Sequence, residues 1–174
     1  MQFLKIGSLT IGLFLSSIAV SQDDSAVSAT ISTSTSTSTT TTGVASVLDD
    51  FHLAAAAGDW QKYFSLMSED GVFLGSDVSE RWPKAEFQSY ANSSSGWTYV
   101  AQMRNINFTP DGNTAWFDEV LLSANYGTSR GTGVLIKTDL GWKISQYHLV
   151  FPIPNALADK ITDEIKAFEA TVNQ

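Results

Sequence analysis

Apolar positions along the chain follow a helical spacing up to about residue 91 and a spacing of two from residue 97 onward. The helical part predicts helices over 44–57, 59–67 and 83–91, with a short strand over 72–74. Asp59 caps the second helix, and Pro83 suits the first turn of the third. Each predicted helix has one apolar face to bury against a core.

The spacing of two predicts a sheet in the second half of the chain. Its expected strands are 97–108, 114–124, 130–137 and 142–150. Gly141 suits the left-handed position of a three-residue loop between the last two strands. Apolar residues at helical spacing then predict a final helix: Leu157, Ile161, Ile165 and Phe168.

Helices followed by consecutive antiparallel strands define an α+β fold class. The expected architecture is a strongly bent antiparallel sheet wrapped around the N-terminal helices, which forms a cone with an internal pocket, plus a C-terminal helix. Any ligand is expected in that pocket, because a cone has one open end.

Two segments precede the folded domain, 44–174. Residues 1–21 have a positive charge, an apolar stretch and small residues at the end, a pattern typical of a cleaved signal peptide. The alternative is a membrane anchor, but the apolar run is shorter than the ~20 residues that a spanning helix needs. Residues 22–43 are rich in Ser and Thr and have little to bury, so a disordered linker is expected. The prediction is an exported protein, periplasmic or secreted, with no membrane attachment after cleavage.

Composition narrows the classes of function. The 174 residues carry a formal net charge of −8 and no cysteine. An acidic chain has no basic surface for nucleic acid, and a chain without cysteine has no disulfides, thiolate nucleophiles or Cys-ligated zinc. Nucleophile elbow, phosphate loop and dinucleotide fingerprint are missing from the sequence, so no cofactor is expected. Asp77 and Glu80 alone are too few ligands for a metal site, and none is predicted.

Several short sequence segments lie within the predicted cone: AAAAGDW, FLGSDVSERW, AWFDE, RGTGVLIK and the closing GWKISQYHLVFPIPN. With them, residues 44–155 resemble the SnoaL-like branch of the nuclear-transport-factor-two-like superfamily, whose fold is the cystatin-like cone. The resemblance implies that Trp82 is a wall of the pocket, with Glu80 and Arg81 as charges at its rim. The alternative is that Trp82 plugs the cone. Homodimerisation through the outer sheet is compatible with the resemblance.

Strand alternation predicts further pocket residues on the last two strands. A three-residue loop pairs Thr138 with Trp142 and so aligns the two strands. The residues expected on the ligand-binding face are Arg130, Thr132, Trp142, Gln146 and His148. The opposite face, which carries Tyr147, is expected to meet solvent or the last helix.

Asp118 and Glu119 are neighbours on one strand, so one of the two carboxylates faces the interior. A carboxylate in an apolar cone suits a general base or acid, whereas a structural ion pair, for instance with Arg130, is the alternative. His148 is the expected proton relay. His52 lies on the apolar face of the first helix and is either a core group or a ligand-binding residue.

Two functions fit these residues. The first is an exported domain that binds a small, largely apolar molecule without turnover. The alternative is a cofactor-independent isomerase, cyclase or hydrolase that uses Asp118 or Glu119 with His148. The two differ in whether a carboxylate and His148 converge inside the cone. The expected partner in both is a small molecule, and the fold class alone does not choose between them.

Overall fold

The computed structural model describes residues 24–172, with side chains from residue 41 onward, and the predicted signal segment 1–21 lies outside the described residues. The chain divides into two compact units, Met1–Thr35 and Ser36–Gln174. In the first unit, the described residues are the beginning of helix α1 (Asp24–Ala57). The second unit holds every other element.

Helix α1 begins at Asp24, whereas the sequence predicts a disordered linker over 22–43. Helix α1 as described includes residues 24–43, and the disordered linker stays a prediction. Helix formation is cooperative: once Val44 and Leu48 are packed in the core, adding turns costs far less than nucleating them.

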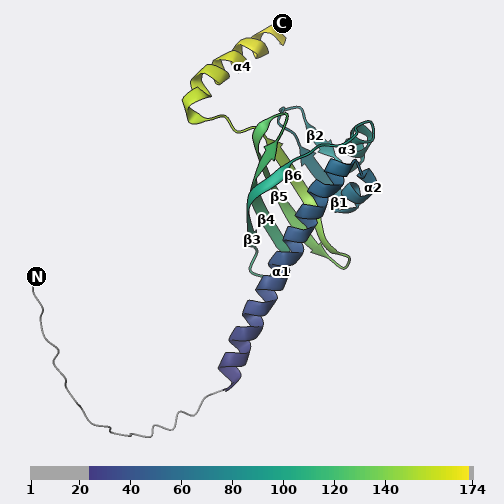
Figure 1. Cartoon of the computed structure of the whole chain (residues 1–174), viewed down its shortest axis with the longest axis vertical. Helices are drawn as coiled ribbons and strands as arrows, with labels where there is room; N and C mark the ends of the chain where they lie inside the picture. Colours follow the sequence, from purple (N-terminus) through teal and green to yellow (C-terminus); the bar gives the residue numbers. More distant parts are fainter. Residues whose placement is uncertain (1–23, 173–174) are drawn as a thin grey trace, which may run out of the picture. The chain divides into compact units, whose positions relative to one another are not determined.

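One curved sheet carries the fold. The remaining elements are α2 (Trp60–Ser65), β1 (Met67–Leu74), β2 (Arg81–Pro83), α3 (Lys84–Ala91), β3 (Val100–Phe108), β4 (Thr114–Ser123), β5 (Gly127–Thr138), β6 (Gly141–Val150), η1 (Asn155–Leu157) and α4 (Ala158–Val172). The strands lie in the order β2-β1-β6-β5-β4-β3, and neighbours are antiparallel except β1 and β6. The sheet curves around α1 without closing (Figure 1), so the α+β cone with its C-terminal helix is confirmed.

Strand β1 is longer than the predicted strand 72–74, and Met67 is its first residue instead of the end of a helix. Helix α2 ends at Ser65, and the carbonyl of Leu66 then accepts from the amide of Ile144 at 2.9 Å. Met67 pairs with Ile144 in a parallel register. Pairing with a distant strand thus overrides the helical spacing of the local sequence.

The core lies between α1 and the concave face of the sheet. The apolar face of α1 contributes Val44, Leu48, Phe51 and Ala55, all buried. The ring of Phe51 stacks on Tyr63 of α2 at 3.9 Å between centroids and lies 5.0 Å from Tyr147 of β6. The apolar face predicted from helical spacing is therefore confirmed.

A bulge at Ser145 decides which residues of β6 face the cone. Thr138 pairs with Gly141, so the loop has two residues instead of the predicted three, and Leu135 pairs with Ile144. Past the bulge, Val134 pairs with Gln146 and Thr132 with His148, as predicted. One extra residue in a strand switches the side chains that follow it to the other face. Ile144 and Tyr147 are both buried as a result, and the expectation that Tyr147 meets solvent is wrong.

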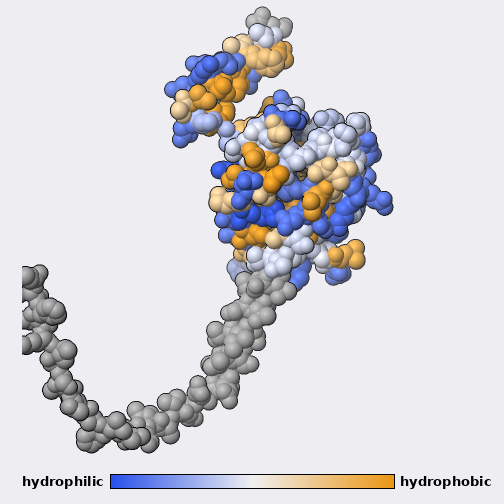
Figure 2. Space-filling view, in the orientation of Figure 1, coloured by the Kyte–Doolittle hydropathy of each residue, from blue (hydrophilic) through white to orange (hydrophobic). Residues whose placement is uncertain are grey.

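Helix α4 carries the predicted apolar stripe without burying it. Ile165, Phe168 and Val172 are all exposed. Figure 2 shows apolar and hydrophilic residues side by side along this helix. Within residues 24–172, no helix combines the length and the hydropathy needed to cross a membrane.

Candidate functional site

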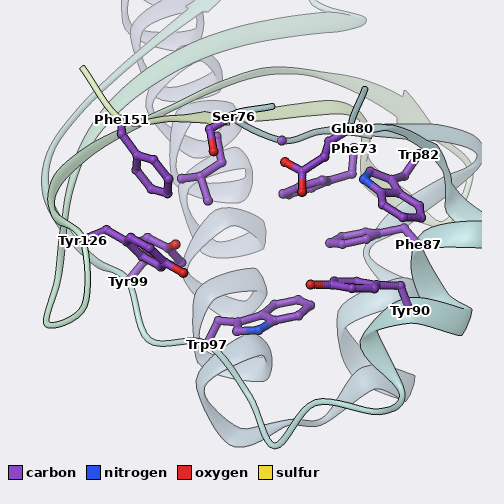
Figure 3. Close-up of a pocket in the computed structure, with 12 residues that line it drawn as sticks. Phe73, Ser76, Glu80, Trp82, Phe87, Tyr90, Trp97, Tyr99, Tyr126 and Phe151 are labelled. Atoms are coloured by element: carbon purple, nitrogen blue, oxygen red, sulfur yellow. The ribbon is translucent and has the colours of Figure 1, made fainter. Parts of the chain in front are cut away.

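An aromatic cavity of about 190 Å³ opens at the end of the sheet where β1 and β6 finish. Figure 3 shows its lining side chains pointing toward a common space. The lining residues are Phe73, Gly75, Ser76, Glu80, Trp82, Phe87, Tyr90, Trp97, Tyr99, Tyr126, Leu149 and Phe151. Eight of the twelve are aromatic, and they come from strands, a helix and three connecting segments.

Ring stacking fixes the walls of this aromatic cavity. Phe73 of β1 stacks on Phe87 of α3 at 4.1 Å, and Trp82 of β2 stacks on Tyr90 of α3 at 5.3 Å. Such pairs add stabilisation beyond the area they bury, about 0.5–1.5 kcal/mol each. The lining rings are therefore held in place by one another before any ligand arrives.

The segment before β3 supplies a further wall because it is tied to the end of α1. The amide of Trp97 donates to the carbonyl of Ala55 at 2.9 Å. Gly96 makes this approach feasible: its φ is 123°, and a Cβ there would lie 2.8 Å from the same carbonyl oxygen. A glycine before Trp97 thus lets the chain cross α1 closely and turn the indole into the cavity.

The loop between β1 and β2 directs one carboxylate into the cavity. The carbonyl of Glu80 accepts from the amide of Gly75 at 2.9 Å, and its side-chain Oε2 accepts from the amide of Asp77 at 3.2 Å. A Cβ on Gly75 would collide with the Glu80 carboxylate. Hydrogen bonds from the side chain and backbone of Ser79 lower the pKa of Asp77, which therefore serves the loop itself. The glycine and the aspartate together place Glu80 on the cavity wall.

A smaller cavity of about 30 Å³ lies deeper and shares Phe73, Trp97, Tyr99 and Leu149 with the aromatic cavity. His52 and Tyr147 line its inner side. A volume above about 10–15 Å³ can hold a water molecule. The inner cavity therefore has room for water, or for one small group of a ligand, next to the imidazole of His52.

A buried carboxylate holds His52 in place. Glu119 is fully buried, and its Oε1 is 2.7 Å from Nε2 of His52 and 2.8 Å from the hydroxyl of Tyr147. Its Oε2 accepts from Nε of Arg104 at 2.8 Å. Arg104 also donates to Asp49 of α1 at 2.7 Å. One carboxylate thus joins α1 to three strands of the sheet.

Burial alone would raise the pKa of Glu119, but the hydrogen bond from His52, with the positive charge and hydrogen bond of Arg104, outweighs burial and lowers it. Burial, with the adjacent charge of Glu119, raises the pKa of Tyr147 well above the ordinary value, so its hydroxyl remains a donor. Glu119 is therefore ionised, and both of its carboxylate oxygens are occupied by donors. Its role is to orient the imidazole of His52, whose Nε2 hydrogen it binds.

The structure places the predicted site residues in three groups. Trp82 lines the aromatic cavity, and His52 lines the inner cavity. Glu119 is the carboxylate that faces inward, which settles the choice between the two neighbours. Trp142 packs against Phe108 near the turn of β6, away from both cavities.

The remaining predicted site residues lie on the outer face of the sheet, which is a correction. Asp118, Thr132 and His148 do come together, because they are cross-strand neighbours in one row, but that row faces away from the core. Gln146 and Arg130 are exposed on the same face. For the residues of β5 and β6, the bulge at Ser145 is the physical reason, and the site that combined Trp82 with His148 is wrong. Arg104, not Arg130, is the ion-pair partner of the inward carboxylate.

Sequence reasoning missed several functional candidates: Arg104, Tyr147, Tyr90, Trp97 and Tyr99. Glu80, expected at the rim of the pocket, does line the aromatic cavity. Arg104 had one usable signal. It is the only charged residue of β3, within a strand of otherwise uncharged residues.

The fold and the cavity define a cystatin-like cone of the nuclear-transport-factor-two-like type. Residues 44–154 match the family model of the SnoaL-like domain, and the chain belongs to that family. A comparison with curated proteins gives no significant match.

Solved structures of the same fold are similar at low identity. A domain of unknown function with a cystatin-like fold from Nostoc punctiforme is 13% identical, with a TM-score of 0.60, over 76% of this chain and 96% of that one. A putative scytalone dehydratase from Novosphingobium aromaticivorans is 12% identical, with a TM-score of 0.56, over 65% and 84%. These likenesses support the fold alone.

Proposed function

We propose that this domain binds a small, largely apolar molecule in the aromatic cavity, as an exported protein. The observation that carries the proposal is the aromatic cavity itself, with eight rings and few polar groups. Ligand sites in proteins are mostly apolar concave surfaces with a small number of placed polar groups. The support for export is the signal-like pattern of residues 1–21.

Replacing Trp82 with Ala should weaken the binding of a neutral aromatic probe, 2-naphthol, by about 1–3 kcal/mol, because a large ring is lost from the wall. Calorimetric titration measures the change. Trp116→Ala is the matched control, since Trp116 is exposed on the outer face of β4 and should leave the affinity unchanged. Equal losses in both variants would contradict the proposed cavity.

A second function is favoured by one observation, the imidazole of His52 held by Glu119 at the inner cavity. With Nε2 donating to the carboxylate, the other ring nitrogen has the lone pair and can accept a proton. We propose proton transfer by His52 as the alternative, in a cofactor-independent isomerase, cyclase or hydrolase. One similar structure is named a putative scytalone dehydratase, so related chemistry has been suggested for this fold.

The two histidines of the chain offer a matched test of that alternative. A ligand first has to be recovered with the native protein and identified by mass spectrometry. His52→Gln should then abolish its conversion while leaving the calorimetric affinity within about twofold, because a base acts mainly in the transition state. His148→Gln, on the outer face, should convert it normally. Absence of product with the unchanged protein would leave binding as the function.

A further inference from the structure

The aromatic cavity has a charge of one sign. Among its twelve lining residues there is no Lys, Arg or His, and the one carboxylic acid is Glu80. We infer that the ligand is a small organic cation, a protonated or methylated amine, bound between aromatic faces with Glu80 as its counter-ion. This inference rests on the proposed binding function and specifies its ligand class.

Glu80 is available to a ligand. Its Oε2 accepts from the amide of Asp77, which fixes the side chain, and within residues 41–172 no hydrogen bond to Oε1 is recorded. None of the ion pairs of the described side chains includes Glu80, whereas the other inward carboxylate, Glu119, is bound by Arg104 and His52. Figure 3 shows the Glu80 carboxylate directed into the space that the rings surround. A half-buried carboxylate directed into an aromatic cavity suits a positive partner.

The surrounding rings provide the second part of a cation site. The face of an aromatic ring is negative, and Trp attracts a cation most strongly. Two of the lining residues are Trp, at 82 and 97, and three are Tyr, at 90, 99 and 126. An aliphatic wall would suit a neutral apolar ligand equally well, but it would give nothing to a positive charge.

Size and overall charge agree with this ligand class. The cavity of about 190 Å³ is below the roughly 300–1,000 Å³ typical for drug-sized ligands, so it suits a compact head group. The net charge of −8 attracts cations toward the protein and repels anions.

The test compares choline with its neutral isostere, 3,3-dimethylbutan-1-ol, which has the same shape without the charge. Quenching of tryptophan fluorescence follows both titrations of the full chain. Choline should bind roughly tenfold more tightly than the isostere, as expected for a desolvated cation against aromatic faces and a carboxylate. Glu80→Gln should remove most of that preference while leaving the affinity for the isostere unchanged.

Glu86→Gln is the control, because it removes the same charge from an exposed position on α3. It should keep the preference for choline. If the isostere or 2-naphthol binds and choline has no advantage, the cation inference is overturned and the proposed binding function stands. If Glu80→Gln prefers choline over the isostere as strongly as the unchanged protein does, the role of Glu80 is overturned. If none of the three probes binds, the proposed function fails together with the inference.

Discussion

Replacing Glu119 with Gln should lower the free energy of unfolding by about 3–5 kcal/mol, because it leaves Arg104, which also pairs with the exposed Asp49, without its buried counter-charge. The amide would still occupy the space of the carboxylate, so the loss would report charge rather than packing. Urea denaturation followed by circular dichroism measures the change. Asp118→Asn is the matched control one position along β4, where the side chain accepts a hydrogen bond from the exposed Asn105 on the outer face. It should cost less than about 1 kcal/mol.

The pH dependence of stability gives the same variant a second readout. Since folding lowers the pKa of Glu119, its stabilisation is present above the unfolded pKa and is lost as the pH falls through the folded pKa. The unchanged protein should lose stability on acidification more steeply than Glu119→Gln. The ionised state of Glu119 would be contradicted if both proteins lost stability equally on acidification. It would also be contradicted if Glu119→Gln lowered the free energy of unfolding by less than about 1 kcal/mol at neutral pH.

Gly131→Ala should destabilise the fold by about 1–3 kcal/mol, since added bulk in a packed core forces neighbouring groups apart. Gly131 lies opposite Glu119 on β5, and a Cβ there would collide with the hydroxyl of Tyr147 and lie 2.9 Å from Oε1 of Glu119. The hydrogen bond between Tyr147 and Glu119 therefore exists because β5 has no side chain at this position. Thermal and urea unfolding measure the loss.

The same substitution at Gly43 should have the opposite sign. Gly43 lies within α1, and a Cβ there would meet Trp142 at an ordinary contact distance of 3.5 Å. Alanine in a helix is favoured over glycine by about 0.5–1 kcal/mol. No loss of stability at Gly131 would show that the glycine of β5 does not make room for the buried network. A loss at Gly43 would show that α1 does not accommodate the added methyl group.

Periodicity predicted the elements of this fold because α1 and the long strands bury one face each. The helical spacing of Leu48, Phe51 and Ala55 is the direct consequence of packing against a sheet, and it is visible in a single sequence. The family resemblance supplied the cone and the wall position of Trp82, which strand patterns alone do not contain.

The candidate site was less predictable because one bulged residue, Ser145, reverses which of the following side chains of β6 face the core. Nothing in the string WKISQYHLV marks Ser145 as a bulge, and straight alternation assigns His148 to the interior and Tyr147 to the exterior. Arg104 was missed for a different reason: Glu119 is its cross-strand partner in the β3–β4 pair, but its second partner, Asp49, lies on α1, 55 residues earlier. Such pairings are properties of the folded sheet and not of the local sequence.

The parallel pairing of β1 with β6 has a consequence for the order of folding. Strands β3 to β6 are joined by short turns and pair with their sequence neighbours, whereas Phe73 must find Tyr147 across more than half of the folded domain. Closing a long loop costs more entropy than closing a turn, so β1 is expected to pair with β6 after strands β3 to β6 have formed their sheet. Because Phe73 and Leu149 both line the aromatic cavity, the binding site comes into existence only with this last, slowest contact. A bound ligand would therefore stabilise the native state without accelerating its formation.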